Sequence, residues 1–172
     1  MACTLAIPTE PLSIALGHIF ALIVCIHMFG PISGAHFNCA VTFSAIITRN
    51  VGLMTGIVYV FVQFVGSILG AALCLGIGKS VDKAVFMAPD DIGDAFRGFA
   101  LEMILTFVLV MTIFGTAVKP QHFKKKDGFQ NLGGLVAAFP IAFALGADAM
   151  AGGRLSGACM NPNRAFVSEI FI

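Results

Sequence analysis

Four long stretches of this sequence carry almost no charge. Asp, Glu, Lys and Arg are all missing from residues 11–48, 51–78 and 132–147, and residues 99–118 contain only Glu102. Runs of about 20 apolar residues match the hydrocarbon thickness of a bilayer. Only 11% of the 172 residues are charged, against about a quarter in soluble domains. The sequence therefore predicts an integral multi-pass membrane protein, with helices near 12–29, 53–77, 98–118 and 132–150.

The charged connections predict the orientation of these helices. The segment 119–131 contains Lys119, Lys124, Lys125 and Lys126 against a single acid, Asp127. Lysine-rich connections remain on the cytoplasmic side of a membrane. We therefore expect 119–131 to lie inside, with the N-terminus and the connection 79–97 outside. The sequence does not tell which membrane the protein inhabits.

Two further stretches, 31–48 and 152–172, are apolar in part but too short to span a bilayer. Residues 33–43 (SGAHFNCAVTF) align with 156–166 (SGACMNPNRAF) without a gap, and Ser, Gly, Ala, Asn and the final Phe coincide. By the predicted topology, the two copies start from opposite sides of the membrane. Short, Gly-interrupted segments at equivalent places of inverted halves indicate a site near the bilayer midplane.

Each copy predicts a half-helix that begins near the midplane. Asn38 and Asn161 are favoured N-cap residues, and Pro162 suits the first helical position. Two helix N-termini then direct their positive ends toward one spot, where the Asn amides offer N–H donors to a passing water. An intramembrane Arg164 is read as functional, and its charge opposes cation passage.

The doubled Asn motif in these contexts, with helix segments 59–73 and 100–117, resembles the aquaporin family. The similarity covers nearly the whole chain beyond about residue 10. The resemblance implies an all-α membrane protein: an inverted-repeat helical bundle with two re-entrant half-helices. It also implies a homotetramer, when complete, whose protomers passively conduct water and small uncharged solutes.

The family has six spanning helices, of which we expect four here. We treat residues 1–172 as a single aquaporin-like channel domain. Its first half-repeat, 1–78, is expected without its first helix, and its second, 98–172, without its last.

The resemblance also assigns a selectivity constriction, counted from the motif asparagines: His18, Ala149, Ala158 and Arg164. This set, with Ala151-Gly152-Gly153, is most similar to the aquaammoniaporin branch. It implies water and ammonia as solutes, and hydrogen peroxide or urea as further ones. Taken alone, a histidine such as His18 is more often a core residue than a pore residue, but its spacing from Asn38 favours the constriction.

The motifs depart from the family pattern at two positions. The first reads Asn38-Cys39-Ala40, with Cys39 in place of Pro, and the second reads Asn161-Pro162-Asn163, with Asn163 in place of Ala. Neither change removes a donor amide, but the larger Asn163 is expected to alter half-helix packing. Gln63 and Glu102 are implied to be scaffold residues that hold the half-helix loops.

The sequence also bears on functions other than a channel. No nucleophile–base pair, phosphate loop or carboxylate pair is present, so no enzyme is predicted, and we expect no cofactor or metal. The net charge of +1 suggests no nucleic-acid partner. His18 and His27 are conceivable haem ligands, although they lie on one helix. The alternatives to a channel are an active transporter and a non-conducting partner that assembles with full-length channels in the bilayer.

Overall fold

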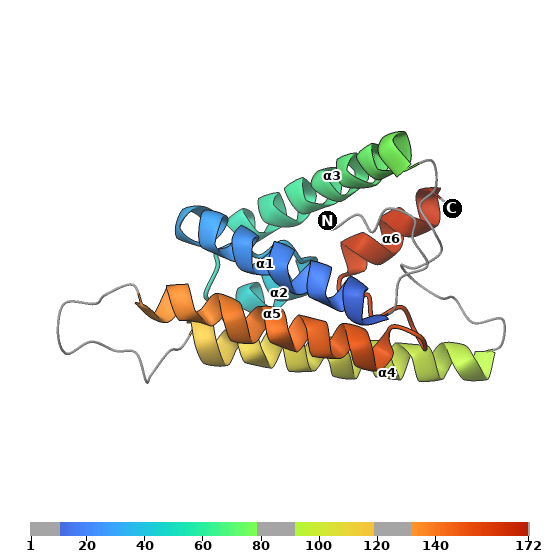
Figure 1. Cartoon of the computed structure of the whole chain (residues 1–172). Coiled ribbons are helices and arrows are strands. Elements are labelled where there is room, and N and C mark those ends of the chain that lie inside the picture. Colours follow the sequence, from blue (N-terminus) through green and yellow to red (C-terminus); the bar gives the residue numbers. More distant parts are fainter. Residues whose placement is uncertain (1–10, 79–91, 119–131, 172) are drawn as a thin grey trace.

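The computed structural model describes residues 11–78, 92–118 and 132–171, and within these ranges every regular element is a helix (Figure 1). The elements are α1 (Pro11–Ser33), α2 (Cys39–Ile47), α3 (Leu53–Gly78), α4 (Ile92–Ile113), the π-helix η1 (Phe114–Val118), α5 (Leu132–Gly152) and α6 (Pro162–Phe171). The all-α prediction is confirmed.

Three described helical segments are long and apolar enough to cross a membrane: Leu12–Ser33, Leu53–Ile77 and Ala95–Val118. In α5, the apolar stretch Val136–Gly152 is shorter by the same measure, although the helix itself has 21 residues. Large apolar side chains point outward, with Ile32 79% and Met54 77% exposed. Outward apolar side chains suit lipid rather than water, and the chain is an integral multi-pass membrane protein.

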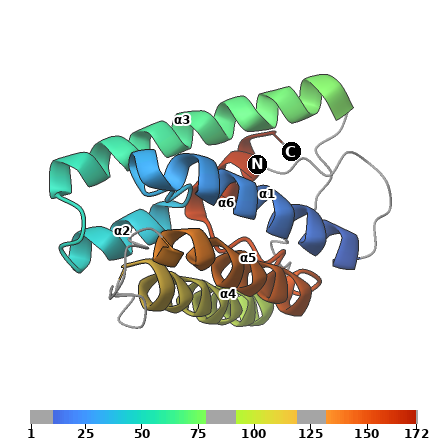
Figure 2. The same ribbon diagram turned by 60° about the vertical axis from the view of Figure 1, so that its left-hand side comes forward.

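The long helices form two groups. Helix α5 packs on α1 and on α4, and the three lie side by side in both views (Figures 1 and 2). Helix α3 contacts α2 and α6, which also contact each other. The apolar core lies between α4, α5 and the loop before α6; its buried members are Leu105, Leu109, Ala137, Ile141, Ala158 and Met160.

The two short helices run away from each other, and their N-termini meet in the middle of the molecule (Figure 1). Helix α2 has 9 residues and α6 has 10. At 1.5 Å per residue, each is about half the length needed to span about 30 Å of hydrocarbon. They are the two half-helices that the repeat predicts.

Helix ends differ from the predictions at two places. Helix α1 continues beyond Phe29 through Pro31 to Ser33, because a proline in the last turn leaves only one helical hydrogen bond unmade. Helix α4 begins at Ile92 rather than Gly98. Charged residues mark the end of an apolar run but not the end of a helix, so the helix predicted from the sequence was too short. The predicted connections within 79–91 and 119–131, and the N-terminal ten residues, lie outside the described residues.

Candidate functional site: the meeting point of two half-helices

The loops that precede α2 and α6 have the same backbone conformation. Positive φ angles occur at Gly34 (80°), Ala35 (50°) and Phe37 (48°), and again at Gly157 (85°), Ala158 (44°) and Met160 (49°). These residues align pairwise in the sequence repeat, so the repeat extends to backbone geometry. L-residues rarely adopt positive φ. Residues held in such conformations cluster at functional sites, which directs attention to this pair of loops.

The two motif asparagines tie the loops together reciprocally. Asn38 Nδ2 donates to the carbonyl oxygen of Met160 at 2.8 Å, and Asn161 Nδ2 donates to that of Phe37 at 3.0 Å. Phe37 and Met160 are themselves aligned in the repeat. Each loop therefore supplies one donor and one acceptor to the other, as a pseudo-two-fold arrangement requires.

The same carboxamides cap the half-helices. Asn38 Oδ1 accepts from the backbone N–H of Ala40 at 2.9 Å, and Asn161 Oδ1 accepts from that of Asn163 at 3.2 Å. Pro162 is the first residue of α6. The sequence had treated both amides as donors for a passing solute. One hydrogen of each Nδ2 is instead bound to the opposite loop, which leaves one hydrogen per amide for a solute.

Glu102, on α4, anchors the second loop. Its Oε1 accepts from the backbone N–H of Cys159 at 2.9 Å and from Ser156 Oγ, and its Oε2 accepts from the N–H of Met160 at 2.8 Å. These donors would otherwise lie buried without partners, since Ser156 is 1% and Met160 3% exposed. Ser156 was missed as an anchor, although its place in the repeat singled it out.

The first loop is anchored by a different group of side chains. Thr42 is fully buried on α2; its hydroxyl donates to the Asn38 carbonyl at 3.2 Å and accepts from Gln63 Nε2 at 2.8 Å. His36 Nδ1 lies 3.1 Å from the same hydroxyl, and the His36 ring meets the Tyr59 ring edge-on at 5.5 Å. The sequence singled out Gln63 but not Thr42, because its role depends on where α3 packs.

Two predicted constriction residues contact each other. Arg164 Nη1 donates to the carbonyl oxygen of Ala158 at 3.3 Å. The third, His18, is half-buried on α1. The fourth, Ala149, is half-buried near the end of α5, where its carbonyl accepts from Gly153.

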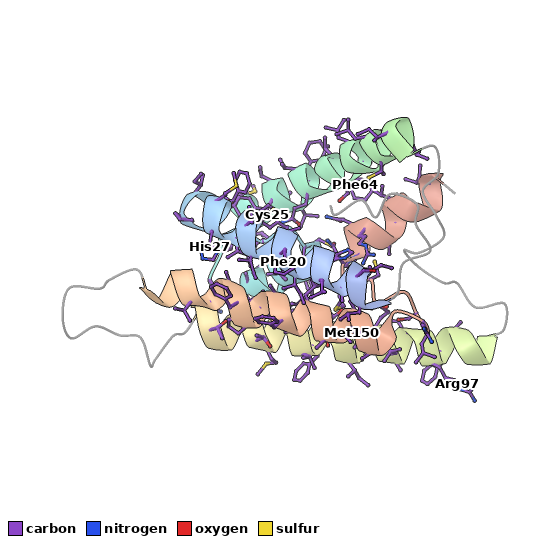
Figure 3. The ribbon with its side chains drawn as sticks, viewed as in Figure 1. Phe20, Cys25, His27, Phe64, Arg97 and Met150 are labelled. Atoms are coloured by element: carbon purple, nitrogen blue, oxygen red, sulfur yellow. The ribbon has the colours of Figure 1, made fainter. Side chains whose placement is uncertain are left out.

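The histidines of α1 are bound to their own helix. His18 Nδ1 lies 2.8 Å from the Ile14 carbonyl and His27 Nδ1 lies 2.7 Å from that of Ile23. The His27 ring, labelled in Figure 3, lies on α1, and it packs edge-on against Phe139. Among the described residues, no group of three or more His, Cys, Asp or Glu side chains is arranged to hold a metal ion. This geometry offers no support for the haem hypothesis.

Both departures from the family motif lie at the meeting point. Cys39 begins α2, and its Sγ lies 4.0 Å from Asn161 Oδ1. Asn163 is only 4% exposed, and its Nδ2 finds no partner in the described part of the chain. A second buried polar residue, Asp148, is 6% exposed and was not singled out by the sequence.

Comparison with known proteins finds a matching family and several similar relatives. The sequence profile of the major intrinsic protein family matches residues 3–172. A probable TIP-type aquaporin of Medicago truncatula is 38% identical over 161 residues, which are 94% of this chain and 60% of the relative. Aquaporin TIP2-3 of Arabidopsis thaliana is also 38% identical over 161 residues, 92% of this chain and 60% of the relative. The chain thus spans about 60% of the length of these curated relatives.

Proposed function

This chain belongs to the major intrinsic protein family, and we propose that its two facing half-helices form part of a passive channel for water and small uncharged solutes. The observation that carries the proposal is the reciprocal pair of bonds between Asn38 and the Met160 carbonyl and between Asn161 and the Phe37 carbonyl. Those bonds hold two helix N-termini and two remaining amide hydrogens at one point. Non-helical backbone at membrane depth is tolerated where it lines a water-filled cavity or is buried in protein.

In this proposal the motif residues Asn38-Cys39-Ala40 and Asn161-Pro162-Asn163 form the narrow centre of the path. His18, Ala149, Ala158 and Arg164 form its selectivity constriction. Two positive helix ends and the Arg164 guanidinium oppose cations and protons but not neutral solutes. Gln63 and Glu102 hold the two loops from behind, and residues 1–78 and 98–172 act as the two half-repeats of one domain.

The finer parts of the proposal concern solutes and assembly. The small Ala149 and Ala158 side chains leave a wide constriction beside a polar imidazole, which suits ammonia in addition to water, and also hydrogen peroxide and urea. We propose a homotetramer as the assembly of the complete channel. The alternative is a non-conducting partner that assembles with full-length channels.

Osmotic water permeability tests the proposal. Proteoliposomes with the 172-residue chain are compared with empty liposomes by stopped-flow light scattering, with Phe61→Leu as a matched control because Phe61 is 68% exposed on α3. We expect permeability above that of empty liposomes for the chain and the control alike. An inserted chain without such permeability contradicts conduction, and its co-purification with a full-length family member then supports the partner alternative.

His18→Phe tests the choice of solute. Phenylalanine narrows the constriction and removes its imidazole, so we expect ammonia flux to fall more than water flux. Ammonia entry is measured by the internal pH rise of liposomes loaded with a pH-sensitive dye. Equal losses of both fluxes would remove ammonia from the proposal.

A further inference from the structure

Three side-chain polar atoms are buried without a partner among the described residues. One is Oδ2 of Asp148, on α5; the other two lie on helices that contact each other, and they are the acceptor Oε1 of Gln63, on α3, and the donor Nδ2 of Asn163, on α6. Nearly all buried polar atoms in native proteins are hydrogen-bonded to protein or to water, and an unpaired one needs an explanation. One of these two atoms requires a donor and the other an acceptor, so their needs are complementary.

Both residues lie on helices of the junction where α2, α3 and α6 contact one another. Gln63 reaches α2 through Thr42. The next residue of α3 is Phe64, which is labelled in Figure 3. Its ring packs against that of Phe166 of α6, with centroids 5.1 Å apart. In a helix, residues three and four apart share a face. Asn163 therefore shares a face of α6 with Phe166 and with Val167, which is fully buried.

The Gln63 carboxamide directs its nitrogen to α2. Its Nε2 donates to the Thr42 hydroxyl at 2.8 Å, and that hydroxyl donates to the Asn38 carbonyl at 3.2 Å. The atom left without a partner is therefore the acceptor Oε1. Asn163 is held at the start of α6 because its backbone N–H donates to Asn161 Oδ1 at 3.2 Å.

We propose that Gln63 and Asn163 together bind one buried water molecule between α3 and α6. The water accepts from Asn163 Nδ2 and donates to Gln63 Oε1, as ordered waters do at otherwise unsatisfied buried groups. This polar link fastens the first turn of α6 to α3, and Asn163 acts as a positioning residue for its neighbour Arg164. The family pattern has Ala at position 163, so the link is a property of this chain's own sequence.

A double-mutant cycle on thermal stability in detergent tests the link, with Asn163→Ala, Gln63→Met and the double variant. With the water in place, Asn163→Ala removes the donor to that water and leaves Gln63 Oε1 less well satisfied. We therefore expect the thermal unfolding midpoint to fall by about 3 °C. In the Gln63→Met background the same change removes an unpaired donor and leaves the midpoint unchanged or raised. Additive changes in the two backgrounds, or stabilisation in both, would overturn the proposal.

Two further variants sharpen the cycle. Asn163→Ser keeps a donor and is expected to retain most of the native midpoint, which distinguishes loss of the link from loss of folding. Ser67→Ala lies one turn beyond Gln63 on α3 and is the matched control, since its effect should add to that of Asn163→Ala. If Ser67→Ala were coupled to Asn163→Ala as strongly as Gln63→Met is, the link between Gln63 and Asn163 would not be specific.

The positioning role of Asn163 rests on the proposed function and has its own readout. In liposomes we expect Asn163→Ala to raise the urea-to-water permeability ratio, because Arg164 is less firmly held, and Asn163→Ser to restore it. An unchanged ratio in a conducting protein would remove the positioning role. If no variant conducts, the proposed function fails while the stability cycle still decides the link.

Discussion

In the first loop, residues 33–38, the polar anchors are neutral side chains: Ser33, and the Thr42 hydroxyl with Gln63 and His36 around it. In the second, residues 156–161, the anchor is the Glu102 carboxylate, which binds two backbone amides and a hydroxyl. The backbone conformation is nevertheless the same in both. Loop shape therefore follows from the shared Ser-Gly-Ala sequence and the reciprocal asparagine bonds.

The anchors differ in strength. Hydrogen bonds to a charged group contribute about 1.5–3 kcal/mol, against about 1 for neutral ones. The amides of Cys159 and Met160 are bound to Glu102, whereas the aligned amides of His36 and Phe37 meet no acceptor within residues 11–78, 92–118 and 132–171. We infer that the second loop is the more firmly held within the described part of the chain.

Glu102→Gln should have the largest effect. A carboxamide keeps the size of the side chain but loses the charge and turns one acceptor into a donor that faces an amide. We expect the free energy of unfolding to fall by about 3 kcal/mol, against about 1 kcal/mol for Gln63→Met in the first half. Detergent-titration unfolding followed by circular dichroism measures both. Equal losses would mean that the two loops are anchored equally.

Asn38→Ala and Asn161→Ala should have the next largest effect and should destabilise the protein equally. Each variant loses a helix cap and a bond to the opposite loop, so we expect the free energy of unfolding to fall by about 2 kcal/mol for either. The same titration measures them, and water permeability should fall for both. A difference above about 1 kcal/mol between them would exceed one neutral hydrogen bond and would break the pseudo-two-fold equivalence.

Glycine-to-alanine variants test the packing of the two halves. A Cβ at Gly152 would lie 2.4 Å from Leu105 Cδ1 and 3.4 Å from Ala158 Cβ, whereas one at Gly56 would approach only Ile46 closely, at 2.3 Å from its Cδ1. At Gly56 the Ile46 Cγ1 also lies 2.5 Å away, but Ile46 is half-buried and can shift, whereas Leu105 is 5% exposed and packed in the core. We expect the free energy of unfolding to fall by about 2 kcal/mol for Gly152→Ala and by about 1 kcal/mol for Gly56→Ala.

Gly66→Ala is the control for those two variants. A Cβ at Gly66 meets no atom within 4 Å, so its higher helix propensity should stabilise α3 by about 0.5–1 kcal/mol. Thermal midpoints of the three variants in one detergent give the ranking. If Gly56→Ala costs more than Gly152→Ala, the first half is the more rigidly packed one.

Arg164→Ala should have the smallest effect on stability and a large one on selectivity. It removes one hydrogen bond, to the Ala158 carbonyl at 3.3 Å, so we expect a loss below about 1 kcal/mol. Urea, glycerol and cation permeability should rise, because a fixed charge at the constriction is gone. Helix α2 carries Val41 at the aligned position, and Val41→Ala is the control that should leave selectivity unchanged.

The sequence predicted most of the fold because bilayer and helix impose local rules. Length and charge-free character revealed the long helices, and the aligned Ser-Gly-Ala and Asn residues revealed both half-helices with their caps. The prediction of α4 was too short because charge marks polarity rather than helix ends. The site was predicted less completely, since the asparagine donors were found but not the carbonyls that they bind.

What the sequence determined by itself was therefore each residue's preference for lipid, for a helix cap or for a tight turn. Those preferences depend on neighbours a few residues away. Only the tertiary structure decided that Asn38 binds a carbonyl 122 residues distant, that Glu102 holds the second loop, and that the helices of Gln63 and Asn163 contact each other. Such pairings depend on which helices pack together, because a hydrogen bond requires two groups to lie within about 3 Å of each other.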